Sequence, residues 1–280
     1  MSTTHVLDES RDAAGVDFDL NKAAAAGDAA GVRRALNCGA NPNALVQFRH
    51  SSIAETAILR AAGAGNAAEV VEILLAAGAS IHARSGDGYD ASLLGIAAGH
   101  GDVDLCRVLV KNGASVDEIS QDEMLPLHIA ANNGRGDVCR FLVDAGADLY
   151  ALHGEYTALH DAAKNGHLEC CKVLVELGLS SSYKAPDPDE FYLTPFQLAV
   201  RYGVIETSAF FVEHCGENVG QTTLSGVDLL DLPFNDKARL ALRSHLLAAE
   251  VARAVNCGGD HARDAVASTP ARKSAGMSPI

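Results

Sequence analysis

The sequence repeats one motif with variations, and this self-similarity constrains the fold more than any single residue does. The motif is clearest at residues 125–146 (LPLHIAANNGRGDVCRFLVDAG) and 157–178 (TALHDAAKNGHLECCKVLVELG). Each copy ends in a glycine, and these glycines are 39, 35, 33, 32 and 38 residues apart. A period near 33 predicts units that cannot bury their apolar faces alone and stack into a solenoid. Six copies are present, ending at Gly39, Gly78, Gly113, Gly146, Gly178 and Gly216.

The residue pattern of the copy at 157–178 predicts two helices. The pair Ala162 and Ala163 lets a neighbouring helix approach closely, and Gly166 permits the left-handed turn that ends a helix. The second half carries apolar residues at helical spacing behind Glu169, an acid in the first turn where the helix dipole favours it. Gly178 then stops the second helix, and a polar hairpin-like segment, the finger, leads to the next copy.

This pattern resembles the ankyrin repeat, whose T-P-L-H-x-A motif is matched by LPLHIA at 125–130, TALHDA at 157–162 and TPFQLA at 194–199. The motif's histidine is replaced by Asn21, Leu59 and Gly95 in the other three copies, where we expect irregular fingers. The resemblance implies an all-α ankyrin-repeat solenoid of about six helix-turn-helix repeats, with β-hairpin-like fingers and a C-terminal capping helix. It also implies that the chain binds other proteins.

Changes in composition along the 280 residues predict four segments. The first is a mobile acidic segment at 1–18, and the third is a helical cap at 218–256, because an open end of the array would leave apolar surface in water. The fourth is a disordered tail at 257–280, rich in Gly, Ser, Pro and Arg. Between them lies the array at 19–217, with repeats at about 19–43, 55–82, 87–117, 121–150, 153–180 and 191–217.

The net charge of −14 opposes binding to nucleic acid or to anionic membranes and favours a protein partner with a basic surface. No secretory signal and no apolar run of about 20 residues is present. The seven cysteines lie in helical patterns or in the tail, and no Asn-x-Ser/Thr acceptor occurs. We therefore expect a soluble monomer in the cytoplasm or the nucleus, a scaffold without a membrane association.

The sequence contains no set of residues with catalytic spacing, so we expect no enzyme, no cofactor and no metal. His128 and His160 occupy equivalent positions, and the resemblance implies a structural role in which they hydrogen-bond the backbone near the fingers. Cys106, Cys139 and Cys171 share one register on successive second helices. Such helices lie about 8 to 10 Å apart, which is too far for disulfides, so we interpret these cysteines as small apolar core residues.

Tyrosines gather in the fingers, and tyrosine often anchors interfaces because it offers a large contact area and a polar tip. Acidic residues accompany them, and the first helices add positions on the concave face. The alternative is that fingers simply favour β-formers and solvated charge. The predicted partner-binding residues are Tyr89, Ile96, Ile129, Tyr150, Tyr156, Asp161, Tyr183, Asp187, Asp189 and Tyr192.

Three functions follow from this pattern. The first is a protein–protein interaction module, an adaptor, inhibitor or assembly chaperone, that binds its partner through finger loops and the concave helix face. The second is a substrate receptor of a ubiquitin ligase, which needs a recruitment box after the repeats; residues 229–242 are leucine-rich but lack its Leu-x-x-x-Cys element. The third, an enzyme or an enzyme-regulatory subunit, would need more chain than the roughly 60 residues that follow the repeats.

Overall fold

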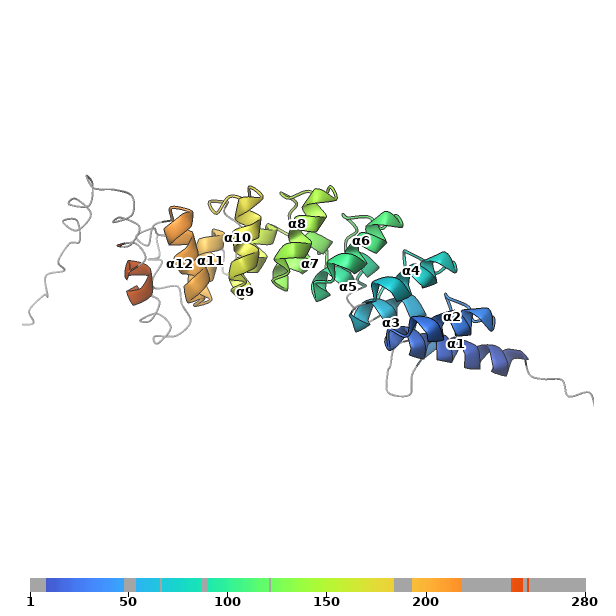
Figure 1. Cartoon of the computed structure of the whole chain (residues 1–280). Coiled ribbons are helices and arrows are strands. Elements are labelled where there is room, and N and C mark those ends of the chain that lie inside the picture. The colour runs from blue at the N-terminus through green and yellow to red at the C-terminus, as the bar shows by residue number, and fades with distance from the viewer. Residues whose placement is uncertain are drawn as a thin grey trace, which may run out of the picture.

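The computed structural model describes residues 9–47, 54–65, 67–86, 90–120, 122–183, 193–217, 243–248 and 251. Within these ranges the helices form two parallel rows along an elongated array (Figure 1). The first helices of the repeats are α1 (Glu9–Ala25), α3 (Ala57–Ala64), α5 (Leu93–His100), α7 (Pro126–Asn132), α9 (Ala158–Asn165) and α11 (Pro195–Arg201). The second helices are α2 (Ala29–Asn37), α4 (Ala68–Ala76), α6 (Val103–Lys111), α8 (Gly136–Asp144), α10 (Leu168–Glu176) and α12 (Ile205–His214).

Local capping explains where these short helices begin. Before α6, the carboxylate of Asp102 accepts the backbone N–H of Leu105 at 2.9 Å, which satisfies a donor that the helix itself leaves free. Before α11, Thr194 and Gln197 form a reciprocal capping box, and Pro195 occupies the first turn, where its missing N–H costs nothing. The sequence therefore specifies the starts of these two helices locally.

Left-handed glycines end the helices as predicted. Gly146, after α8, has φ of +100°. Gly166, after α9, has φ of +78°, and a Cβ added there would lie 2.7 Å from Cγ1 of Val204 in the next repeat. Glycine is needed at this second position both for its backbone angle and because the neighbouring repeat packs directly on it.

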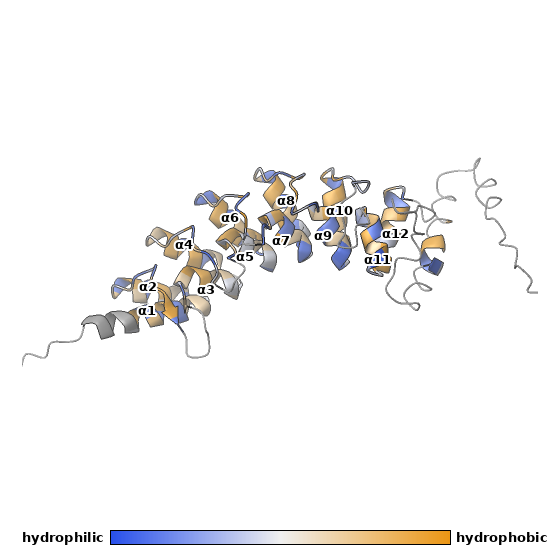
Figure 2. Cartoon of the chain, turned by 180° about the vertical axis from the view of Figure 1, so that it is seen from behind, coloured by the Kyte–Doolittle hydropathy of each residue, from blue (hydrophilic) through white to orange (hydrophobic). Residues whose placement is uncertain are grey.

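The core is one continuous apolar cluster to which both rows of helices contribute, and apolar segments, orange in Figure 2, recur along the array. The alanine pairs of the first helices, such as Ala97 with Ala98 and Ala162 with Ala163, are fully buried, which permits the close approach of neighbouring helices. The second helices contribute larger side chains, including Leu74, Leu109 and Leu142. Exposed ion pairs also join successive second helices: Arg33–Glu69 at 3.6 Å, Lys111–Glu72 at 3.8 Å and Arg140–Glu176 at 2.6 Å.

The first helix starts earlier than residue 19, where we placed the first repeat. Helix α1 begins at Glu9, and Val16 packs against the core that contains the fully buried Leu20. The helix continues because it has apolar surface to cover at the first repeat. At the other end, residues 243–248 are helical and Leu246 is fully buried in the same apolar cluster. The rest of the predicted cap, apart from Val251, and the predicted tail lie outside the described residues.

The fingers contain the only β-structure among the residues described. Strands β1 (Val46–Gln47) and β2 (Ala54–Glu55) form an antiparallel pair, with Val46 opposite Glu55. Two later fingers carry single bridges, Arg84 with Ser92 and His153 with Tyr156. None of the helices in the described part of the chain combines the length and hydropathy that crossing a lipid bilayer requires.

Candidate protein-binding surface

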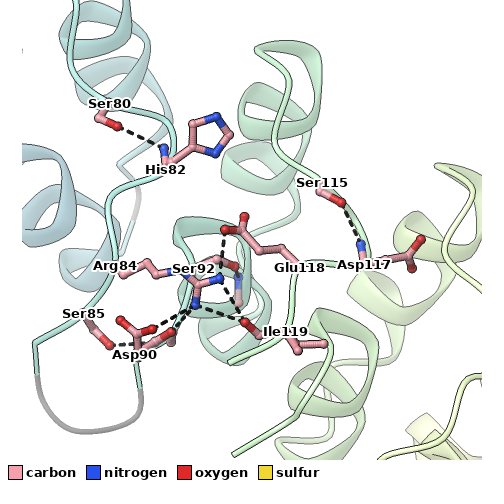
Figure 3. Close-up of polar contacts among 12 residues, drawn as sticks. Ser80, His82, Arg84, Ser85, Asp90, Ser92, Ser115, Asp117, Glu118 and Ile119 are labelled. Atoms are coloured by element: carbon pink, nitrogen blue, oxygen red, sulfur yellow. Dashed lines mark hydrogen bonds and ion pairs between the residues drawn. The ribbon is translucent and has the colours of Figure 1, made fainter. Parts of the chain in front are cut away.

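The fingers project in one row along the array, and side chains link each finger to the next. The clearest link is Arg84, whose guanidinium donates to the carbonyl of Ile119 from both terminal nitrogens at 3.0 Å (Figure 3). The same guanidinium contacts the carboxylate of Glu118 at 3.0 Å and the carbonyl of Asp90 at 2.6 Å. One cation thereby joins its own finger to the next finger along the array.

His160 plays the structural role expected of it. Its Nδ1 lies 2.8 Å from Oγ1 of Thr157 and 3.3 Å from the backbone N–H of the same residue, while Nε2 lies 3.1 Å from the carbonyl of Tyr183. These contacts fit one tautomer, in which Nδ1 accepts and Nε2–H donates. The ring of Tyr156 stacks on His160 at 5.5 Å and the ring of Tyr183 meets it edge-on at 5.7 Å. A buried histidine thus holds two finger tyrosines.

His128, the equivalent residue one repeat earlier, is fully buried beside His153, with ring centroids 5.9 Å apart. Neither ring nitrogen has a hydrogen-bond partner within the described residues, although the backbone of Ala151 and Tyr156 lies near the ring. Burial lowers the pKa of His128 to about 4, and burial does the same for His160. Both rings are therefore neutral at physiological pH and are parts of the scaffold.

His153 in turn links two fingers, because its Nε2 lies 2.9 Å from the carbonyl oxygen of Asp122.

Several large apolar side chains of the fingers remain in solvent. Tyr150 is 63% exposed and Tyr183 39% exposed, as their predicted role requires, whereas Tyr156 is half-buried under its contact with His160. Tyr150 also reaches along the array, since its hydroxyl lies 3.4 Å from the carbonyl of Gly178. Tyr89, Asp187, Asp189 and Tyr192 lie outside the described residues, so their part in the site stays a prediction.

Our sequence reasoning missed three exposed aliphatic residues: Leu45 at 70%, Ile119 at 53% and Leu152 at 42%. Each of them lies six residues after the glycine that ends a second helix. Arg84 occupies the same register in the second finger, which lies between the fingers of Leu45 and Ile119. Aligning the repeats on these glycines would have revealed the register.

The first helices present a less open surface than the prediction assumed. Ile96 and Ile129 are half-buried, and Ile129 lies over Gly95 and Gly99 of α5, where a Cβ would come within 3.1 and 3.3 Å of it. Asp161 is only 6% exposed, and burial raises the pKa of its carboxyl to about 7 despite the nearby Lys164. The ammonium of Lys164 itself lies over the ring of Tyr202 at 5.4 Å.

The six cysteines in the described ranges are all free, which agrees with the prediction that the cysteine register forms no bridges. The neighbour of Cys139 is Cys170, with sulfurs 3.6 Å apart, rather than the equivalent Cys171. Burial raises the pKa of the Cys106 thiol to about 12 and that of Cys171 above its usual range, so these thiols are poor nucleophiles. Among the residues described, no group of three His, Cys, Asp or Glu side chains could hold a metal ion.

The stacked helix pairs and the finger row define a repeat solenoid, and comparison with known proteins agrees with this fold. The family model for ankyrin repeats in three copies matches residues 20–119, 58–153 and 94–185. The chain therefore belongs to the ankyrin repeat family. The structure is similar to that of the human ASB11 ankyrin repeat domain, with a TM-score of 0.65 and 24% identity over 82% of this chain and 97% of that one. Comparison with curated proteins found no match.

Proposed function

We propose that this chain is a stand-alone protein–protein interaction module, an adaptor, inhibitor or assembly chaperone, that binds one partner protein along its fingers. Ankyrin repeats indicate protein binding as the general class of function. One observation carries the proposal that the fingers are the contact surface. Tyr150 and Tyr183 are exposed, and they lie on fingers that hydrogen bonds hold in place. Fixed aromatic side chains lose little conformational entropy when they bind.

The first helices contribute less to the proposed contact. Ile96 and Ile129 offer only part of their surface, and the carboxyl of Asp161 is covered by its own repeat and its neighbours. We assign them to the edge of the contact rather than to its centre. The exposed tyrosines of the fingers indicate that the partner binds on the finger side of the array.

The experiment that tests this proposal is site-specific photo-crosslinking in cells. A photoreactive phenylalanine analogue replaces Tyr150 in one version of the chain and Tyr202 in another. Tyr202 is a matched control because its exposure, 39%, equals that of Tyr183, while it lies at the end of α11 farther from the fingers. We expect a covalent adduct with one protein at position 150 and none at position 202.

Purified partner then allows the affinity to be measured. Tyr150→Ala and Tyr183→Ala should each weaken binding by about 1 to 3 kcal/mol, the usual range for an aromatic anchor, and Tyr202→Ala should leave it unchanged. Equal crosslinking at positions 150 and 202, or unchanged affinity in both finger variants, would contradict binding through the fingers.

We further propose that the chain meets its partner in the cytoplasm or the nucleus. The free, buried cysteines of the array support this compartment.

We also propose that residues 218–256 cover the last repeat, and the burial of Leu246 supports this. Residues 229–242, where a ubiquitin-ligase recruitment box would have to lie, are outside the described residues.

A further inference from the structure

Three aliphatic side chains form a row along the fingers, which we call the apolar finger row: Leu45, Ile119 and Leu152. Their common register, six residues after each helix-ending glycine, places them at equivalent points of the first, third and fourth fingers. Their exposures of 70%, 53% and 42% are high for leucine and isoleucine. Repetition of exposed apolar residues at one register distinguishes this row from scattered surface leucines, which need no explanation.

Arg84 occupies the same register in the second finger and fixes the geometry of the row. Its guanidinium holds the carbonyl of Ile119, as Figure 3 shows, while Glu118 and the carboxylate of Asp90 neutralise its charge. The backbone that presents Ile119 is therefore positioned before any partner arrives. Preformed contacts of this kind reduce the ordering cost of binding.

The surroundings of the row are acidic. Exposed carboxylates lie in the same fingers as Ile119 and Leu152, at Asp117, Asp122, Glu123, Asp148 and Glu155. Arg84, the basic residue at the same register in the second finger, already forms ion pairs with Asp90 and Glu118. A partner that covers the row therefore needs aliphatic side chains with basic residues beside them.

The spacing of the repeats restricts the conformation of that partner. Neighbouring stacked helices lie about 8 to 10 Å apart, and an α-helix rises about 1.5 Å per residue, so one repeat corresponds to about five to seven residues. Seven residues, at the upper end of this range, return to the same helix face. An extended strand covers the distance in about two and a half to three residues, so its alternating side chains do not stay in register with the row. A polyproline helix fits the distance too, but its usual sites are lined by aromatic rings rather than aliphatic chains.

We propose that the apolar finger row binds a basic amphipathic helix of the partner protein, with apolar residues that recur every seven positions and Lys or Arg between them. Ile119 and Leu152 contact residues one heptad apart, and Leu45 contacts a residue two heptads beyond Ile119. This inference rests on the proposed function, and it adds the kind of segment that the fingers recognise.

The test is selection from a displayed library of random peptides, each about three heptads long, against the intact chain. We expect enriched sequences to carry apolar residues at seven-residue spacing with basic residues between them. The affinity of the most enriched peptide is then measured by fluorescence anisotropy. The triple variant Leu45→Ser, Ile119→Ser, Leu152→Ser should lose about tenfold or more of that affinity.

Two further variants make the result specific. Leu247→Ser with Val251→Ser removes exposed aliphatic surface near the C-terminus, 46% and 62% exposed, and should bind like wild type. Asp117→Asn with Asp122→Asn leaves the row intact and should slow association of the basic peptide, an effect that added salt also produces. Thermal melting of each variant verifies that the array is folded.

Enrichment of peptides with three-residue spacing, no enrichment, or equal binding by the folded triple variant would overturn this inference. A partner crosslinked at position 150 but not at position 202 would still support the proposed function. The two proposals can therefore fail separately.

Discussion

Three buried ionisable residues respond to pH in opposite directions. Burial lowers the pKa of His128 and His160 from 6.5 to about 4, so below pH 6.5 the unfolded chain takes up protons that the folded chain does not. Their contribution to stability is complete above pH 6.5 and is lost as the pH falls towards 4. Burial raises the pKa of Asp161 from 3.8 to about 7, so the folded state is favoured below pH 3.8 and loses this advantage as the pH rises through 7.

The variant Asp161→Asn tests this balance. At pH 8 the wild-type carboxylate is ionised while buried, and the neutral amide should raise the free energy of unfolding by about 1 to 4 kcal/mol. Near pH 4 the carboxyl of the folded protein is protonated, and the two proteins should be equally stable. Chemical denaturation at both pH values measures the difference. A gain of the same size at both would show that ionisation of Asp161 is not its cause.

The glycine that ends α8 provides a second test at the residue scale. Gly146 has φ of +100°, and no atom of the described residues would lie within 4 Å of a Cβ at this position, so strain of the backbone alone opposes substitution. Gly146→Val should destabilise the chain by about 1 to 3 kcal/mol, because a β-branched residue disfavours this conformation. Gly63→Ala, in the helix α3 with equally open surroundings, should be neutral or stabilising by up to about 1 kcal/mol. Equal melting temperatures for Gly146→Val and wild type would contradict the argument.

Roles that a residue's own repeat determines could be predicted from the sequence, and roles that depend on neighbouring repeats could not. Gly146 and His160 act within or next to their own repeat, and their positions in the motif were sufficient. The half-burial of Ile129 depends on two glycines of the preceding helix, Gly95 and Gly99, which a single motif does not reveal. The hydrogen bonds that hold the backbone of Ile119 likewise come from Arg84, 35 positions earlier in the preceding finger.

At the scale of the element, the fingers are ordered by contacts between side chain and backbone rather than by strands. Arg84 supplies three such contacts, one to the carbonyl of Asp90 and two to the carbonyl of Ile119, and it also contacts the carboxylate of Glu118. Arg84→Met keeps the apolar stem and removes the donors. Hydrogen bonds to charged groups contribute about 1.5 to 3 kcal/mol, so local opening of residues 115–124 should become about ten- to a hundredfold more frequent.

Hydrogen exchange read by mass spectrometry measures that opening. Lys111→Met is the control, because it removes an exposed ion pair with Glu72 at 3.8 Å between two second helices, and such pairs contribute little. Faster exchange in the finger of Arg84→Met but not of Lys111→Met is the expected result. Unchanged exchange in both variants would show that the finger is held without Arg84.

Element boundaries were predictable inside the array and less so at its ends. The six helix pairs follow from the repeated apolar pattern and from the left-handed glycines that recur in each repeat. Helix α1 begins at Glu9, earlier than the repeat pattern indicated, and Val16 of this added part packs against the core. The two longest fingers, at 43–55 and 180–193, contain no periodic pattern, so their conformation could not be derived from sequence.

At the scale of the whole molecule, each repeat packs only on its neighbours, so stability is distributed along the array rather than concentrated in one central core.

Leu20 in α1 and Leu142 in α8 are both fully buried leucines, one at the N-terminal end and one in the middle. Leucine-to-alanine changes at such sites cost about 2 to 5 kcal/mol. Leu20→Ala should therefore speed hydrogen exchange in the first repeat and in the second repeat that packs on it, α1 to α4, because the later repeats keep their neighbours. Leu142→Ala weakens the interfaces on both sides and should speed exchange from α5 to α10. Native-state hydrogen exchange, followed helix by helix, separates these patterns. Uniform acceleration in both variants would instead show that the array unfolds as one cooperative unit.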